Sequence, residues 1–190
     1  MTKSTSAHGA AAAYLQRFPD INMRLHPERI ADHEVSIERR HFSSPAELGD
    51  FYTAFRATHH RVEAALANPF ARPLKVKDTV ARIDEHCDIV RTSFLSMRDY
   101  FIAEGKHQRI EVPAYDTGPN GYLLLDGNHR TTGLYMAGVP FTLTLTVLKA
   151  PVDRRNLIDL KYWDGGLNRF FNRIRRGTSE DIVRRACRFP

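Results

Sequence analysis

The pattern of apolar and polar residues predicts strands and helices that follow one another along the chain. Over residues 34–42 the two kinds alternate, which is typical of a half-buried strand. This spacing puts Val35 and Ile37 on one side, with Ser36 and Glu38 on the other. We therefore expect a strand here, with Val35 and Ile37 facing the core.

Two helical regions are predicted after this strand. Ser44 is a suitable cap, Pro45 a suitable first helical residue, and Glu47 completes the start signal. This helix would run to about residue 67, with an apolar stripe of Leu48, Phe51, Tyr52 and Phe55. The second region covers residues 78–105, ends at Gly105 and turns one apolar face to the core. That face consists of Val80, Ile83, Cys87, Val90, Phe94, Met97 and Phe101.

The remaining elements are shorter. Alternating patterns predict three strands, at 109–112, 122–125 and 141–148, with a turn at 116–121 between the first two. A helix over 129–137 ends at Gly138, a typical C-cap. Helices are also expected at residues 10–17, 153–163, 166–176 and 179–187.

The composition is that of an ordinary soluble globular protein, with 42% hydrophobic and 26% charged residues among 190. No apolar run approaches the roughly 18 residues that a membrane helix needs. The N-terminus has no apolar signal core, so we expect a cytoplasmic protein without a membrane partner. We expect an N-terminal arm at 1–30 and one domain at 31–150, with a helical insertion at about 56–105. A basic helical tail at 151–190 would pack on the same domain.

The cysteines and histidines do not suggest a structural metal. Cys87 and Cys187 lie far apart without CxxC spacing, and the nine histidines show no spacing such as HExxH. A structural zinc ion usually needs four clustered ligands. We therefore expect both cysteines to be reduced.

The net charge of +6 lies in the tail. Residues 154–190 contain ten Lys and Arg against four Asp and Glu, a balance of +6, so the preceding residues are neutral overall. An anionic partner should therefore meet the tail. The predicted helix at 166–176 has an apolar stripe and a basic face. Three interpretations remain open: a helix docked on the core, a nucleic-acid surface and a membrane-surface helix.

The most informative segment follows the apolar strand Leu123–Leu125. Gly127 permits a backbone dihedral, or a close ligand approach, that a Cβ would forbid. The amides of Asn128, His129 and Arg130 would then be free donors at the positive end of a helix dipole. Such an end binds anions.

The side chains of this segment also suit a phosphate. Arg130 offers a planar fork, His129 a further donor, and Thr131 and Thr132 offer hydroxyls. Asp126 does not fit as a phosphate ligand, because a carboxylate beside a phosphate usually holds Mg²⁺ or takes a proton. The alternative is an ordinary strand-to-helix turn, with Asp126 as the N-cap and Arg130 on the surface.

Residues 122–141, which include Asp126-Gly-Asn-His-Arg130, resemble the signature of the ParB/sulfiredoxin superfamily. The resemblance implies an α+β fold with a small mixed sheet. In that fold a strand delivers a Gly-x-x-Arg turn that binds nucleotide phosphates. Sulfiredoxins carry a nucleophilic Cys where this chain has Asn128, so sulfinic acid repair is not expected.

The Asp-Gly-x-His-Arg form is similar to the free-serine kinases of this superfamily. The resemblance implies that Asp126, His129 and Arg130 act on the phosphates of a nucleotide, and that an N-terminal Glu acts as the base. Glu34 and Glu38 are candidates for that base by location. Asn128 stands where those kinases often have a second His.

The sequence thus predicts a phosphotransferase that uses ATP or ADP, with Mg²⁺ held through Asp126, and acts on a small hydroxyl-bearing metabolite. Asp126, His129 and Glu38 would be catalytic, and residues 127–132 would bind the phosphates. The alternative is a ParB-like regulator that uses a nucleotide as a switch and its basic tail to bind DNA.

Overall fold

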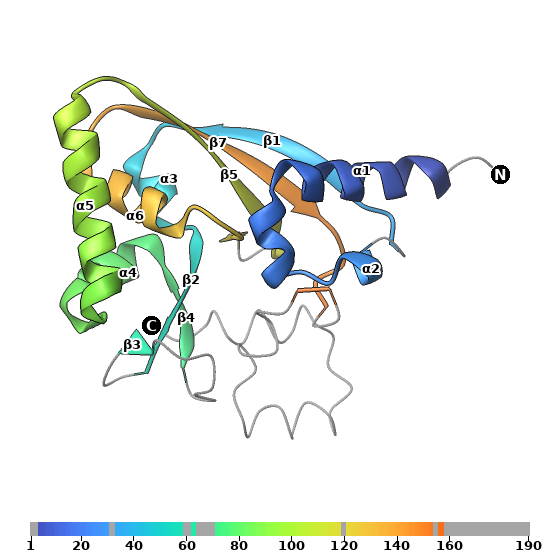
Figure 1. Cartoon of the computed structure of the whole chain (residues 1–190), viewed down its shortest axis with the longest axis horizontal. Coiled ribbons are helices and arrows are strands. Elements are labelled where there is room, and N and C mark those ends of the chain that lie inside the picture. Colours follow the sequence, from blue (N-terminus) through green and yellow to red (C-terminus); the bar gives the residue numbers. More distant parts are fainter. Residues whose placement is uncertain are drawn as a thin grey trace.

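A computed structural model describes residues 4–30, 33–58, 62–63, 71–118, 121–153 and 156–157. They form an α+β fold in which helices lie on both faces of one mixed sheet (Figure 1). The strands are β1 (Ser36–Phe42), β2 (Tyr52–Ala57), β3 (Val62–Glu63), β4 (Arg72–Lys75), β5 (Gln108–Asp116), β6 (Tyr122–Leu124) and β7 (Phe141–Lys149). The helices are α1 (Ser4–Arg17), η1 (Pro19–Met23), α2 (Pro27–Ile30), α3 (Pro45–Gly49), α4 (Val76–Ala81), η2 (Ile83–Glu85), α5 (Asp88–Glu104) and α6 (Asn128–Ala137).

The strand order is β1-β7-β5-β6-β2-β3, and β4 also pairs with β2. The long central strands β5 and β7 are parallel, from the pair Gln108↔Phe141 to the pair Tyr115↔Leu148. β1 adds to β7 in antiparallel orientation, and β6 adds to β5 in the same way. The connection from β6 through α6 to β7 therefore places the start of α6 at the centre of the sheet.

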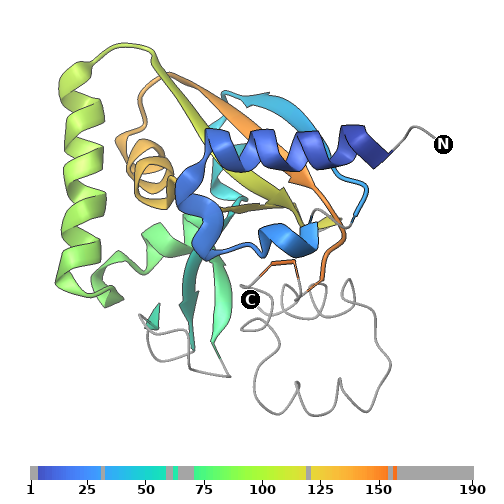
Figure 2. The ribbon, with the colours of Figure 1, turned by 45° about the vertical axis from the view of Figure 1, so that its right-hand side comes forward.

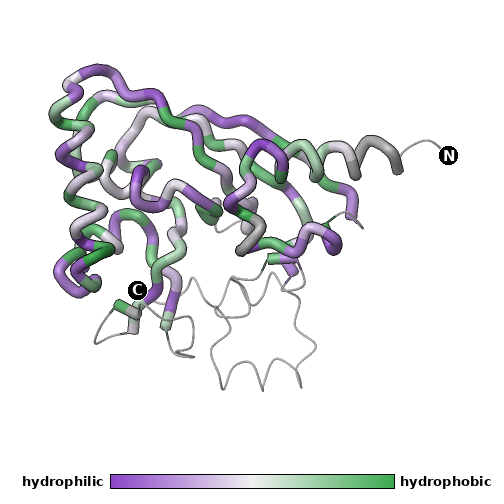
Figure 3. Tube along the Cα trace, in the orientation of Figure 1, coloured by the Kyte–Doolittle hydropathy of each residue, from purple (hydrophilic) through white to green (hydrophobic). Residues whose placement is uncertain are grey.

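Two cores lie on opposite faces of this sheet. The first packs α1, η1 and α2 on the sheet and includes Tyr14, Leu25 and Tyr115. The second lies under α3, α4, α5 and α6 and includes Leu134 and Leu145. Figure 2 shows α1 crossing the sheet strands, with α5 and α6 to one side. Along α5, apolar and polar positions follow each other in short segments (Figure 3), as expected for a helix with one buried face.

The N-terminal segment is a layer of the fold. Its helix begins at Ser4, earlier than the expected residue 10, and ends at Arg17 before Pro19. Tyr14 is buried, and its hydroxyl lies 2.9 Å from the carbonyl oxygen of Ala114 and 3.0 Å from that of Thr146. These carbonyls belong to the neighbouring strands β5 and β7, so Tyr14 joins α1 to the centre of the sheet.

The long helix predicted from Ser44 is wrong. α3 ends at Gly49, and the chain enters strand β2 at Tyr52. The spacing of Phe51, Tyr52 and Phe55 fits a helical stripe, but aromatic and β-branched residues also favour strands. β2 gains backbone partners from β6, β3 and β4, and this pairing outweighs the helical pattern.

The second helical region is divided into α4, η2 and α5. Phe94 and Phe101 are buried as predicted, and Gly105 is confirmed as the C-cap of α5, with a φ of 58°. Cys87 is exposed at the N-cap of α5 rather than on the apolar face. The expected helical insertion at about 56–105 also contains β3 and β4, because these short strands extend the sheet beyond β2.

The strand predicted over 34–42 is confirmed as β1, but its buried side is only partly right. Val35 is buried just before β1, whereas Ile37 is 37% exposed. β1 forms the edge of the sheet and pairs only with β7 among the strands described. The core therefore covers less of this strand than the alternating pattern suggested.

The elements around the candidate turn are confirmed. The strands predicted at 109–112, 122–125 and 141–148 appear as β5, β6 and β7, and α6 ends at Gly138 with a φ of 62°. The helices expected at 166–176 and 179–187 lie outside the described residues. Within the helix expected at 153–163, Leu157 is described; it is buried and forms an isolated bridge with Leu25 instead of a helical turn. Within the described parts of the chain, no helix is long and apolar enough to cross a membrane.

Candidate phosphate-binding turn

The turn between β6 and α6 requires glycine for two reasons. Gly127 is the N-cap of α6 and has a φ of 72°, in the left-handed region that disfavours a Cβ. A Cβ on Gly127 would also lie 2.5 Å from Cγ1 of Val112 in β5. The sequence predicted a special dihedral or a close approach, and the approaching group is the protein's own central strand.

The N-cap position of α6 belongs to Gly127, so Asp126 does not occupy it. Among the described residues, no side-chain cap hydrogen bond is present at this helix start. The amide of Thr131 donates to the carbonyl of Gly127 at 2.8 Å and makes the first helical bond. The amides of Asn128, His129 and Arg130 precede that bond and have no acceptor in their own helix. They form a positive helix end suited to an anion.

Asp126 and Arg130 lie beside each other at this helix end. Nη2 of Arg130 is 3.4 Å from Oδ2 of Asp126, and each side chain is nearly half exposed. An exposed pair of this kind contributes little stability. Both charged groups can therefore turn to a ligand at small cost.

Arg24 supplies a second guanidinium close to the turn. Its Nη1 donates to the carbonyl oxygens of Leu124 at 2.6 Å and Leu125 at 2.9 Å, directly before Asp126. No local pattern pointed to this residue, because Arg24 follows η1 and lies about a hundred positions earlier in the chain. The packing of the neighbouring Leu25 in the first core places Arg24 at the end of β6.

Asn128 is used by the fold itself. Its Oδ1 accepts a hydrogen bond of 2.9 Å from the amide of Ala54 in β2. This bond ties the first residue of α6 to a strand 74 positions earlier. The backbone amide of Asn128 remains suited to a phosphate, while its side-chain oxygen holds the turn in place.

His129 points into an aromatic cluster formed with Phe55, His86 and Phe94. Its ring centroid lies 5.7 Å from that of Phe55 and 5.1 Å from that of Phe94. His86 contacts the same two rings at 5.2 Å each. Burial lowers the pKa of both histidines, and the Nε2 atoms of both are buried without a hydrogen-bond partner among the described residues. The expected donor role of His129 at the surface of the turn is therefore not seen in this arrangement.

Thr131 and Thr132 lie inside the protein. Both side chains are fully buried, and neither Oγ1 has a hydrogen-bond partner in the described part of the chain. A contact between these hydroxyls and a phosphate at the surface of the turn is not seen in this arrangement, and their assignment stays a prediction. Directly after them, α6 packs closely on α5, where a Cβ on Gly133 would lie 2.5 Å from Cβ of Met97.

Glu38 lies away from the turn. It accepts hydrogen bonds from Arg40 and Lys149, and these contacts hold the pKa of its carboxyl below the usual value. It belongs to β1, which is three strands away from β6 in the order β1-β7-β5-β6, or about 14 Å across the sheet. Glu34 is exposed and precedes β1. The structure thus brings neither glutamate to residues 126–130.

Mg²⁺ can be accommodated only with help from a ligand. No group of three or more His, Cys, Asp or Glu side chains could hold a metal ion within the described residues. Mg²⁺ commonly binds through one or two carboxylates together with substrate phosphates. Asp126, half exposed beside the free amides, can supply one such carboxylate.

Comparison of the chain with protein-family models, with curated proteins and with solved structures finds no match. The resemblance to the ParB/sulfiredoxin superfamily therefore remains a prediction from the sequence. The geometry of the turn carries the functional argument.

Proposed function

We propose that the protein is a nucleotide-dependent phosphotransferase that acts on a small hydroxyl-bearing metabolite. The observation that carries this proposal is the uncapped start of α6 behind Gly127, with Arg130 and Asp126 exposed beside it. Free amides and a guanidinium can hold the phosphates of ATP or ADP. The resemblance of residues 122–141 to nucleotide-binding turns supports the same assignment.

The chemistry requires mainly positioning and neutralisation of charge. The amides of residues 128–130 would bind phosphate oxygens, and Arg130 would add a charge-assisted, bidentate contact. Mg²⁺, when bound with the nucleotide, would neutralise phosphate charge. Asp126 would either orient that ion or take the proton of the acceptor hydroxyl.

His129 would contribute indirectly in this proposal. Its ring anchors the first turn of α6 in the aromatic cluster and so keeps the amides in place. Glu38 is left out of the mechanism, because it is paired with Arg40 and Lys149 on the edge strand β1, three strands away from β6.

The test is the Arg130→Ala variant in a titration with ATP and with ADP, each with and without Mg²⁺. Loss of a charge-assisted contact should weaken binding by about 1.5–3 kcal/mol. Arg91→Ala is a matched control, because Arg91 also forms an exposed pair on a helix, with Asp88 of α5. It should bind nucleotide as the unchanged protein does.

Equal affinities of the Arg130→Ala and Arg91→Ala variants would contradict the site assignment. Turnover is measured separately, by nucleotide consumption in the presence of pooled amino acids and other small hydroxyl compounds. If nucleotide binding depends on Arg130 but no pool supports nucleotide consumption, the protein binds nucleotide without transferring phosphate. That result would contradict the proposed phosphotransferase activity.

A further inference from the structure

The face of the sheet that carries the first core becomes polar over residues 39–41 of β1, 109–111 of β5 and 142–146 of β7, while the other face carries the second core. Thr144 of β7 lies between His41 of β1 and Glu111 of β5. Its neighbours Leu143 and Leu145 are fully buried on the opposite face. Because side chains alternate between the two faces along each strand, these strands have a buried apolar face and a charged region on the opposite face.

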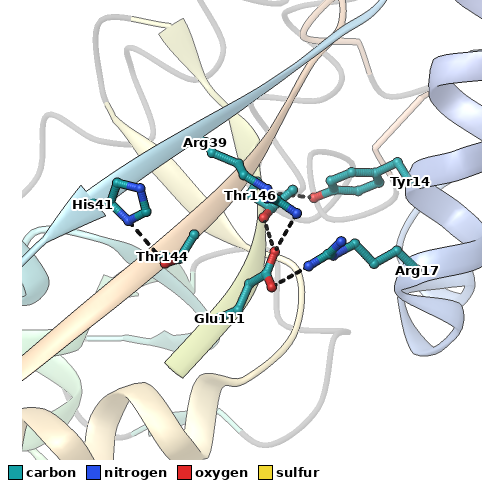
Figure 4. A network of polar contacts seen from close by, with 7 residues as sticks. All are labelled: Tyr14, Arg17, Arg39, His41, Glu111, Thr144 and Thr146. Carbon is teal, nitrogen blue, oxygen red and sulfur yellow. Dashed lines mark hydrogen bonds and ion pairs between the residues drawn. The ribbon is translucent and has the colours of Figure 1, made fainter. Parts of the chain in front are cut away.

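Glu111 organises the charged side (Figure 4). It accepts a hydrogen bond of 2.6 Å from Arg17 of α1 and one of 2.5 Å from Thr146, and Arg39 of β1 lies 3.8 Å away. Burial would raise the pKa of this carboxyl, but the bonds from Arg17 and Thr146 outweigh it and hold the pKa below its usual value. Glu111 is thus charged at neutral pH and positions two arginines, which stay about half exposed.

The arginines outnumber the acid on this face. We call the group of Arg17, Arg39, His41, Arg109, Glu111 and Thr144 the arginine face. Its three guanidinium groups stand against one carboxylate, and Arg39, His41 and Arg109 are exposed. His41 is hydrogen-bonded to Thr144, which holds its ring over the strands. The face therefore presents fixed positive charge and polar donors on a rigid sheet.

We propose that the arginine face binds the phosphate backbone of a nucleic acid. Guanidinium groups match phosphate geometry in a bidentate manner, and hydroxyl and imidazole groups add further contacts. The exposed side chains of the face are charged or polar, and Phe18 next to Arg17 is partly buried, so the face would contact the backbone rather than the bases. The proposal is independent of the nucleotide turn.

A long polyanion fits better than a short acidic peptide. Residues 154–190 carry an excess of six positive charges in the sequence, in addition to those of the arginine face. A long polyanion can also gain from the net charge of +6 of the whole chain, and the resulting affinity should depend steeply on salt.

The experiment measures fluorescence anisotropy of a labelled single-stranded 30-mer DNA and of its duplex at several salt concentrations, with the full chain. The variant Arg39→Glu/Arg109→Glu should lose at least about tenfold in affinity at low salt. Its salt slope should also fall by about 0.7–0.9 for each lost phosphate contact. The control Arg91→Glu/Arg98→Glu makes the same charge change on α5, which packs on the other side of the sheet, and should bind almost as the unchanged protein does.

Circular dichroism establishes that both variants are folded. If charge reversal disturbs the fold, Arg39→Gln/Arg109→Gln makes the same test by neutralisation. Equal losses in the face variant and in the α5 control would overturn the proposal, since charge alone would then explain them. Absence of DNA binding by the unchanged protein at low salt would also overturn it, as would binding of an acidic peptide in place of DNA.

Discussion

At the scale of single residues, Gly127 and Asp126 have different tasks in the turn. Gly127 shapes the backbone, because its φ of 72° and the nearby Val112 both exclude a side chain. Asp126 supplies an exposed charge that neither caps the helix nor forms a strong pair. Substitutions at these two positions should therefore affect different properties, stability in one case and turnover in the other.

Gly127→Ala should destabilise the protein by about 2–4 kcal/mol, the sum of left-handed strain and overpacking. Gly138→Ala is the matched control, because Gly138 has a φ of 62° but open space around its missing Cβ. It should lose only the strain, about 1–2 kcal/mol. Urea unfolding of both variants measures the difference, and equal losses would show that Val112 moves aside freely.

Asp126→Asn should leave stability almost unchanged, because only a weak, exposed ion pair is lost. If Asp126 orients Mg²⁺ or takes a proton, turnover should fall by about a hundredfold or more. The two measurements are a thermal unfolding curve and nucleotide consumption with the accepted substrate. A fully active variant would exclude Asp126 from the chemistry and leave only a binding turn.

At the scale of elements, α6 is held at its start and along its side. Asn128 fixes its first residue to β2, and His129 inserts between Phe55 and Phe94. Gly133 brings it so close to α5 that an added Cβ would lie 2.5 Å from Cβ of Met97. The position of the helix end, and with it the candidate phosphate-binding turn, depends on these three contacts.

The aromatic cluster predicts a loss of stability in mild acid. Burial holds the pKa of His86 and His129 below the usual value of about 6.5. Asp126 and Glu85 raise these pKa values in part, whereas Arg82 lowers that of His86. Below about pH 6.5 the unfolded chain therefore binds more protons than the folded protein. The free energy of unfolding should decrease as the pH is lowered through this range. Above that pH, the contribution of the two histidines is fully present.

Urea unfolding at pH 7.5, 6.5 and 5.5 measures this effect, which is at most about 1.4 kcal/mol per pH unit for each histidine. The variant His86→Phe/His129→Phe should show a flatter dependence over this range. His41→Gln, on the exposed edge strand, is the control. A slope in the double variant as steep as in the control would assign the acid sensitivity to other groups.

Most of the segment 122–149 could be predicted because its signals are local. Gly127 and Gly138 mark the two ends of α6, and both adopt the left-handed conformation. The positions of His129 and Thr131 could not be predicted in the same way. Thr131 is buried, and the ring of His129 packs on Phe55 and Phe94, which lie far away in the sequence.

At the scale of the whole molecule, the sheet is closed on one face by the N-terminal segment. Tyr14 is buried against β5 and β7, Arg17 binds Glu111, and Arg24 reaches the end of β6. A segment expected as an arm thus supports both the candidate turn and the arginine face. Its removal should affect the entire fold.

Tyr14→Phe tests this dependence. Loss of the buried hydroxyl should lower the free energy of unfolding by about 1–2 kcal/mol, because two strand carbonyls lose a donor. Tyr100→Phe, with a residue that is 53% exposed on α5, should change stability little. Global unfolding in urea is the measurement. An unchanged midpoint in the Tyr14 variant would mean that α1 detaches before the sheet unfolds.

The sequence by itself determined the elements whose signals are local: the strand, glycine turn, helix and strand of residues 122–149, and the end of α5 at Gly105. Only the tertiary structure decided that residues 52–57 form a strand, that His129 faces inward and that Arg24 lies beside the turn. The physical reason is the same in each case. Backbone pairing and burial depend on partners that are distant in the chain, and these partners outweigh the local pattern.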